Sequence, residues 1–205
     1  MLDSHLRPFI DPTLNAIGRF LAKYGVSANF ITLSGFIIGL LAVPFIINQQ
    51  YTVALVLIGI NRLFDGIDGG IARQTKLSDF GGFLDIVCDF IFYSAIVFAF
   101  ALARPHEALW GVFLVFSFIG PITSFLAYAI IAAKHQHITT VRGTKSFYHL
   151  GGICEGTETM AVLMLMCLFP SAFAMICLVY GMLCWLTTLG RVLQARRDFR
   201  SSEIV

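Results

Sequence analysis

Charged side chains are scarce in this sequence. Asp, Glu, Lys and Arg make up 13% of its 205 residues, and 58% of the residues are hydrophobic, whereas about a quarter of a soluble domain is charged. This scarcity argues against an ordinary soluble domain and predicts an integral membrane protein. The formal net charge of +2 is too small to indicate a nucleic-acid partner, and we expect none. The basic loops instead suit the anionic head groups of a lipid bilayer.

Six hydrophobic stretches are each long enough to cross the hydrocarbon core of a membrane as a helix. They cover approximately residues 28–48, 51–73, 80–103, 107–134, 146–169 and 171–194. The alternating pattern of a transmembrane β-barrel is not found in them. The sequence therefore predicts an all-α polytopic membrane protein with six transmembrane helices.

The basic residues indicate an orientation. All Lys and Arg except Arg62 and Arg104 fall at the two ends of the chain or in the second–third and fourth–fifth connections. These regions share one side of a six-span bundle, and the positive-inside rule makes that side cytoplasmic. Both termini are therefore expected in the cytoplasm.

The chain divides into three parts in this interpretation. Residues 1–25 mix apolar and basic side chains at helical spacing, which favours an amphipathic helix on the cytoplasmic membrane surface over a flexible tail. Residues 26–195 form the six-helix domain, and residues 196–205 form a cytoplasmic tail.

Four aspartates interrupt the second and third hydrophobic stretches, where charge is costly. Asp65 and Asp68 are three residues apart, and Asp85 and Asp89 are four apart, so each pair lies on one helix face. A short turn joins the two helices, and we expect both pairs at similar depth. Carboxylates that converge in this way are satisfied by hard divalent cations. With Arg73 nearby as a phosphate ligand, the pattern predicts metal-assisted phosphoryl transfer.

Two other interpretations explain buried acids. In the first, the aspartates pair with Arg62 and Arg73 as structural salt bridges, but four acids against two bases leave a buried surplus of charge. In the second, the acids belong to a transporter or a proton relay. The sequence has no broken-helix repeats of the kind typical of transporters, and a relay does not explain the spacing of glycine, alanine and arginine.

The stretch DGIDGGIAR, from Asp65 to Arg73, is followed by Gly81, Asp85 and Asp89. It resembles the signature of the CDP-alcohol phosphotransferases, D-x-x-D-G-x-x-A-R, then a spacer, then G-x-x-x-D-x-x-x-D. The spacer here is the seven residues 74–80, one fewer than is most common in that family. Because the spacer falls in the turn between helices, we expect a tighter turn and no lost ligand. Six spans with an N-terminal surface helix are also the family's architecture, so the resemblance covers nearly the whole chain.

The resemblance implies a reaction and a role for each signature residue. An alcohol acceptor would attack the β-phosphate of a CDP-linked lipid such as CDP-diacylglycerol, releasing CMP, with Mg²⁺ or Mn²⁺, two ions in all, as cofactor. The metal ligands would be Asp65, Asp68, Asp85 and Asp89, and Asp89 would also act as the general base. The residues binding the CDP moiety would be Asp68, Gly69, Ala72, Arg73 and Gly81. The alternative within the family is an aminoalcohol phosphotransferase, in which CDP-choline or CDP-ethanolamine donates to diacylglycerol.

The resemblance also implies a homodimer, and the compact chain without long loops favours a CDP-diacylglycerol donor. We expect the protein in a bacterial inner membrane, with the active site facing the cytoplasm. Acceptor-site candidates lie outside the signature, at Lys145, Glu155, Glu158 and Arg191. The two glutamates could equally serve a hydrogen-bond network between helices. Arg191 could equally extend to the lipid head groups.

Overall fold

The computed structural model describes residues 2–75, 77–134 and 152–202, and this part of the chain is helical without strands. The α-helices are α1 (Leu2–Lys23), α2 (Ala28–Leu40), α3 (Ala42–Ile47), α4 (Tyr51–Ala72), α5 (Asp79–Ala103), α6 (Ala108–Lys134), α7 (Gly156–Leu168) and α8 (Phe173–Ser202). Short 3₁₀ turns at Pro105–Glu107 and Pro170–Ala172 precede α6 and α8. The predicted all-α class is confirmed.

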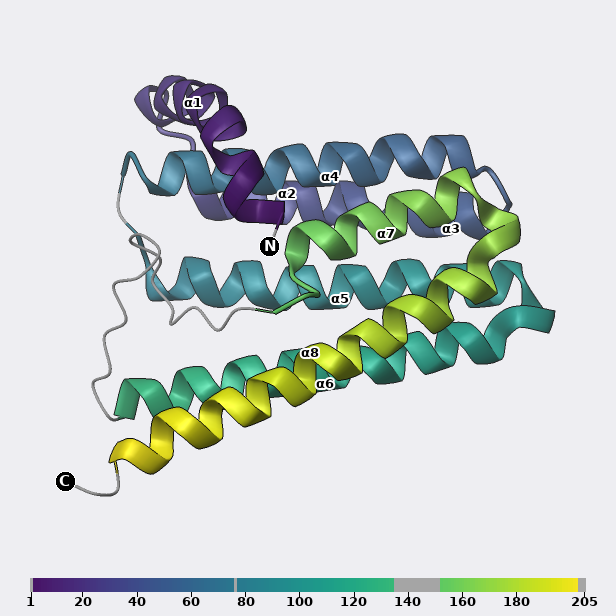
Figure 1. The fold of residues 1–205 in the computed structure, drawn as a ribbon. Helices are drawn as coiled ribbons and strands as arrows, with labels where there is room; N and C mark the ends of the chain where they lie inside the picture. Colours follow the sequence, from purple (N-terminus) through teal and green to yellow (C-terminus); the bar gives the residue numbers. More distant parts are fainter. Residues whose placement is uncertain (1, 76, 135–151, 203–205) are drawn as a thin grey trace.

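Helices α2 to α8 form an elongated bundle, and α1 lies across one end of it (Figure 1). The α1–α2 turn, the α4–α5 turn and the C-terminal end of α8 lie at that same end. The turns after α3, α5 and α7 lie at the opposite end. The bundle therefore alternates in direction as the hydrophobic stretches predict, while the cytoplasmic orientation of either end stays a prediction.

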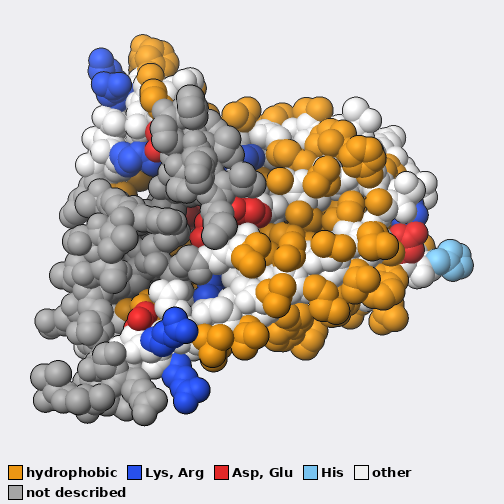
Figure 2. Space-filling model, in the orientation of Figure 1, with side chains coloured by type: hydrophobic (Ala, Val, Ile, Leu, Met, Phe, Trp, Pro, Cys, Tyr) orange, Lys and Arg blue, Asp and Glu red, His pale blue; other side chains and the backbone are white. Residues whose placement is uncertain are grey.

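Four helical segments in the described residues are long and apolar enough to cross a membrane. They are Ala28–Ile47, Asp79–Ala103, Pro105–Lys134 and Pro170–Phe199. Helix α4 has the length but carries Arg62, Asp65 and Asp68, and α7 has only 13 residues. Residues 146–151 of the predicted fifth span lie outside the described residues, so the count of six spans stays a prediction. Figure 2 shows a broad band of hydrophobic side chains between charged groups at the two ends, as an integral membrane protein requires.

Glycines bring α2 close to its neighbours. A Cβ atom built on Gly35 would lie 2.6 Å from Cβ of Phe64 on α4, and one built on Gly39 would lie 2.7 Å from the ring of Phe92 on α5. The side-chain amide of Asn61 on α4 also donates a hydrogen bond of 3.0 Å to the Gly35 carbonyl. This small-residue packing sets the distance between α2 and the helices that carry the aspartates.

Helix α1 packs directly on the C-terminal half of α4. A Cβ atom on Gly18 would collide with the backbone of Gly70, and one on Gly70 would lie 2.6 Å from the Leu14 carbonyl oxygen. The two backbones touch because neither glycine carries a side chain. Residues Leu2–Lys23 are helical, while the amphipathic character of this helix and its position on a membrane surface stay predictions.

Candidate active site

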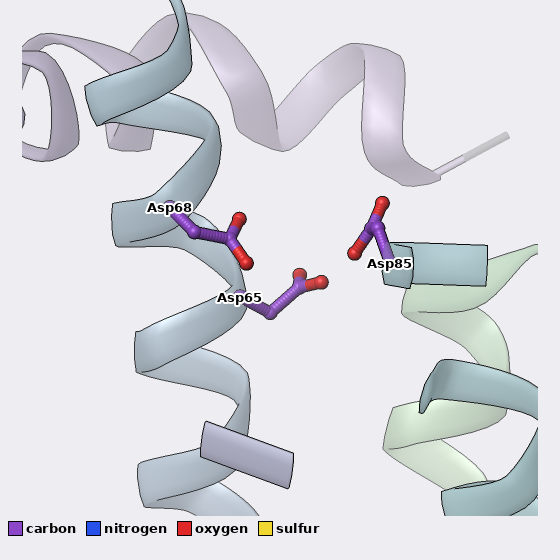
Figure 3. Close-up of side chains that lie close together, drawn as sticks. All are labelled: Asp65, Asp68 and Asp85. Carbon is purple, nitrogen blue, oxygen red and sulfur yellow. The ribbon is translucent and has the colours of Figure 1, made fainter. Parts of the chain in front are cut away.

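Three of the four aspartates meet at the end of the bundle that α1 covers. Asp65 and Asp68 extend from adjacent turns of α4, and Asp85 faces them from α5 (Figure 3). One carboxylate oxygen of each residue lies within 4.8 Å of those of the other two. Like charges this close repel, and a divalent cation between them removes the repulsion. A set of donors made up only of oxygen atoms fits Mg²⁺ or Mn²⁺. We call Asp65, Asp68 and Asp85 the carboxylate cluster.

Neighbouring helices orient these acids. The Thr32 hydroxyl on α2 donates a hydrogen bond of 2.5 Å to Oδ2 of Asp68, which is only 7% exposed. The Arg62 guanidinium forms an ion pair with Asp65 and also donates a hydrogen bond of 3.0 Å to the hydroxyl of Thr157 at the start of α7. The cluster is therefore connected to α2 and α7 as well as to its own helices.

Asp89 lines the same cavity but lies outside the carboxylate cluster. Its Oδ2 accepts a hydrogen bond of 2.9 Å from the hydroxyl of Tyr93, one turn further along α5. Tyr93 is 4% exposed, and its ring packs among aromatic residues of the core. A rigid, buried donor of this kind restricts the rotamers open to the Asp89 carboxylate.

The salt-bridge interpretation of the acids is only partly supported. Arg62 pairs with Asp65 as that interpretation requires. Arg73 instead turns toward α1, where its Nε donates a hydrogen bond of 2.8 Å to Oδ1 of Asn15, and its Nη2 lies 3.9 Å from Oδ1 of Asp11. Its guanidinium is thus positioned by α1 rather than by the aspartates of the signature.

A cavity of about 650 Å³ contains the site. Near the aspartates its lining is polar and includes Arg62 and Arg73. On α6 and α7 the lining includes the apolar side chains of Phe118, Ile122, Phe125, Met160 and Met164, and Glu155 and Arg191 add charged groups beside α7 and α8. The cavity thus combines charged groups that suit a metal and phosphates with apolar walls.

The predicted CDP-binding residues occupy different positions relative to this cavity. Gly69 and Arg73 line it, whereas Ala72 and Gly81 lie outside its lining as the described residues define it. Gly81 belongs to the first turn of α5, where its backbone N–H donates a hydrogen bond of 2.9 Å to the capping hydroxyl of Ser78. Helix α5 begins at Asp79, within the spacer of residues 74–80, and Asp85 reaches the carboxylate cluster. The tighter turn stays a prediction.

The acceptor-site candidates also differ in whether they line the cavity. Glu155 and Arg191 line the cavity, while Glu158 lies on α7 outside its lining. Arg191 is 6% exposed, and its Nη1 donates a hydrogen bond of 2.8 Å to the Pro121 carbonyl, so its guanidinium is buried in the bundle rather than extended to lipid head groups. Lys145 lies outside the described residues.

Sequence reasoning missed several polar residues of the site: Asn15, Thr32, Tyr93 and Thr157. Thr32 had a usable signal, because it is a polar residue within a very apolar stretch, and such residues commonly have a partner inside the bundle. Asn15 had no comparable signal, since polar residues are ordinary in an amphipathic helix. Its contact with Arg73 spans 58 residues of sequence.

The protein is thus a helical bundle with membrane-length apolar segments and a cavity lined by carboxylates. The chain belongs to the CDP-alcohol phosphatidyltransferase family, whose model matches residues 25–193. It is accordingly an enzyme, a transferase of phosphate-containing groups.

Curated relatives match almost the whole chain. An inner membrane protein of Escherichia coli, YnjF, is 51% identical over 193 residues, which cover 94% of each chain. The archaetidylinositol phosphate synthase of Pyrococcus horikoshii is 30% identical over 195 residues, covering 95% of this chain and 96% of the other. The match to a protein named for the inner membrane agrees with the integral membrane character of the structure.

A solved structure shares the fold. The crystal structure of Mycobacterium tuberculosis phosphatidylinositol phosphate synthase with CDP-DAG bound superposes with a TM-score of 0.72 at 16% sequence identity. The match covers 89% of this chain and 93% of the other. At this level of identity the likeness concerns the fold alone.

Proposed function

We propose that the protein transfers a phosphatidyl group from a CDP-linked lipid, such as CDP-diacylglycerol, to an alcohol acceptor and releases CMP. The observation that carries the proposal is the convergence of Asp65, Asp68 and Asp85 within 4.8 Å at a cavity that Arg73 also lines. Family membership supports the reaction class. The CDP-DAG bound to the mycobacterial structure supports a lipid donor.

The signature residues hold the donor and its metal ions in this proposal. Mg²⁺ or Mn²⁺, two ions in all, bind the four aspartates Asp65, Asp68, Asp85 and Asp89. When bound, such ions stabilise the negative charge on the attacking and leaving oxygens. Arg73 binds a donor phosphate through its planar guanidinium. Gly69, Ala72 and Gly81 accommodate the rest of the CDP moiety because they carry little or no side chain.

Asp89 acts as the general base. The acceptor hydroxyl attacks the β-phosphorus, its proton passes to the Asp89 carboxylate, and the bond between the β-phosphorus and the bridging oxygen breaks, so that CMP leaves with that oxygen. The hydrogen bond from Tyr93 keeps the Asp89 carboxylate directed toward the cavity. A base of this kind must reach the attacking hydroxyl within hydrogen-bond distance.

The acceptor occupies the part of the cavity next to α7 and α8. Glu155 and Arg191 line this part, and we include Glu158 and Lys145 as further candidates. Arg191 offers a buried positive charge, and Glu155 offers a hydrogen-bond acceptor for an alcohol. A panel of alcohols supplied as acceptors identifies the one that the enzyme uses.

We also propose that the site and both termini face the cytoplasm of a bacterial inner membrane, and that the enzyme is a homodimer. The distribution of Lys and Arg supports the orientation. The name of the Escherichia coli relative supports the membrane. The dimer rests on the resemblance to the family.

CMP release by the purified protein tests this function. CDP-diacylglycerol is supplied with Mg²⁺ or Mn²⁺ and a panel of alcohols, and CDP-choline or CDP-ethanolamine with diacylglycerol is supplied in parallel. Asp85→Ala removes a cluster carboxylate, and Asp79→Asn changes an exposed acid in the first turn of the same helix as a matched control. We expect acceptor-dependent release that persists in Asp79→Asn and vanishes in Asp85→Ala. Release only from the aminoalcohol donors would overturn the choice of donor, and no release from any pair would overturn the function.

A further inference from the structure

Arg73 is held by α1, a helix that lies outside the residues that the family model matches. Its Nε donates to Oδ1 of Asn15 at 2.8 Å, and its Nη2 lies 3.9 Å from Oδ1 of Asp11. Its Nη1 lies above Gly69, 3.4 Å from where a Cβ atom would stand. Two edges of the guanidinium thus face α1, and Nη1 lies beside a glycine that lines the cavity.

The contact between Arg73 and α1 has a defined geometry, because close packing prevents α1 from sliding along α4. Gly18 and Gly70 bring the two backbones together, and Leu14 fills the space beside Gly66, where a Cβ atom would lie 2.7 Å from the leucine Cδ1. Leu14 and Asp11 also line the cavity. Helix α1 therefore forms part of the wall of the site.

We propose that Asn15 is a positioning residue for Arg73, and that Asp11 is a counter-ion which the donor diphosphate displaces from the guanidinium. This inference rests on the proposed function, since it assigns Arg73 to the donor phosphates. It makes α1 part of the nucleotide-binding machinery in addition to any role at the membrane surface.

The two α1 residues differ in charge, and their effects on donor binding therefore differ in sign. The Asn15 amide is a neutral acceptor, so it orients the guanidinium without competing with phosphate for positive charge. Fixing a long, flexible side chain before the ligand arrives lowers the entropic cost of binding. The Asp11 carboxylate is an anion in a partly exposed pair, with side-chain exposures of 38% for Asp11 and 41% for Arg73. Such pairs are weak, and a diphosphate that brings more negative charge displaces the carboxylate.

Binding of CDP with Mg²⁺ to the purified protein, measured by titration calorimetry, tests the inference without an acceptor. Asn15→Ala should raise the Kd about fivefold, as for loss of one typical intramolecular hydrogen bond. Asp11→Asn should lower the Kd roughly twofold, because a weak competing anion is removed. Thr13→Ala, an exposed polar change on the same helix, should leave the Kd unchanged. Equal Kd values for Asn15→Ala and Thr13→Ala would overturn the role of Asn15, and a higher Kd in Asp11→Asn would overturn that of Asp11.

A double-mutant cycle separates positioning from a merely structural role. Lysine has no Nε–H at the place where arginine meets Asn15, so Asn15→Ala should add nothing to the effect of Arg73→Lys on the Kd. A further increase in the double variant would overturn the inference. Asn15→Leu, which keeps the side-chain shape without the acceptor, repeats the test should α1 loosen in Asn15→Ala.

Kinetics distinguish failure of this inference from failure of the proposed function. In the CMP-release assay, Asn15→Ala should raise the KM for CDP-diacylglycerol and leave the KM for the alcohol unchanged. If the wild-type protein binds CDP but the Asn15→Ala and Thr13→Ala variants have equal Kd values, this inference alone is overturned. Wild-type protein that neither binds CDP nor releases CMP would overturn both.

Discussion

The hydroxyl of Thr32 on α2 lies 2.5 Å from Oδ2 of Asp68 on α4, and this hydrogen bond connects the carboxylate cluster to a helix that carries none of its members. Asp68 is buried, so the orientation of its carboxylate depends on the few groups around it. Loss of a group that orients a metal ligand in this way typically lowers metal affinity or activity about 10- to 100-fold. In the proposed function, the packing of α2 on α4 therefore helps to orient a metal ligand.

Replacement of Thr32 tests this connection. Thr32→Val keeps the shape but removes the donor, and it should raise the Mg²⁺ or Mn²⁺ concentration for half-maximal CMP release about 10- to 100-fold. Thr32→Ser should stay close to wild type, because serine retains the hydroxyl. Ser34→Ala is the matched control, since the Ser34 hydroxyl donates to the Phe30 carbonyl of its own helix. An unchanged metal requirement in Thr32→Val would contradict the role assigned to this hydrogen bond.

Replacement of Gly35 tests the helix packing. Gly35→Ala would bring a methyl group to 2.6 Å from Cβ of Phe64, which is too close for the two helices to keep their distance. We expect a loss of about 1–3 kcal/mol in the free energy of unfolding, as for other overpacked positions, measured as a lower thermal midpoint of the purified protein. Gly59→Ala on α4 is the control, because no atom of a neighbouring element lies within 4 Å of the place where its methyl group would stand. Equal midpoints for the two variants would show that α2 does not pack on α4 as described.

Replacement of Asp89 tests the general base. Asp89→Asn is nearly isosteric and should preserve the thermal midpoint while lowering kcat for CMP release by roughly 10²- to 10⁴-fold. The exposed Asp79→Asn on the same helix should retain wild-type kcat. A kcat within a fewfold of wild type in Asp89→Asn would exclude this residue as the base.

Removal of divalent ions tests the carboxylate cluster as a whole. EDTA should abolish CMP release, and Mg²⁺ or Mn²⁺ added in excess should restore it, because the three clustered carboxylates repel one another without a cation. Asp65→Asn and Asp68→Asn should each require more metal for the same rate. Full activity in EDTA would contradict a metal-dependent reaction.

The class of protein and the acidic site were predictable because both depend on local properties. A hydrophobic run long enough to span a membrane is a continuous stretch of sequence, and the all-α prediction from these runs is confirmed. The spacing from Asp65 to Asp68 directs both side chains to one face of one helix. The short turn before α5 then brings Asp85 opposite them. The same residues make up the family signature, and the family predicted from it is confirmed.

The sequence by itself determined the helical membrane class, the family and the acids that gather at one end of the bundle. Only the tertiary structure decided which of these acids form the cluster, which residues orient them, and that Arg191 is buried beside the cavity. It also decided that Arg73 meets Asn15 on a helix far away in sequence. The physical reason is that helix periodicity arises from neighbours along the chain, whereas a hydrogen bond between helices depends on how closely their surfaces pack.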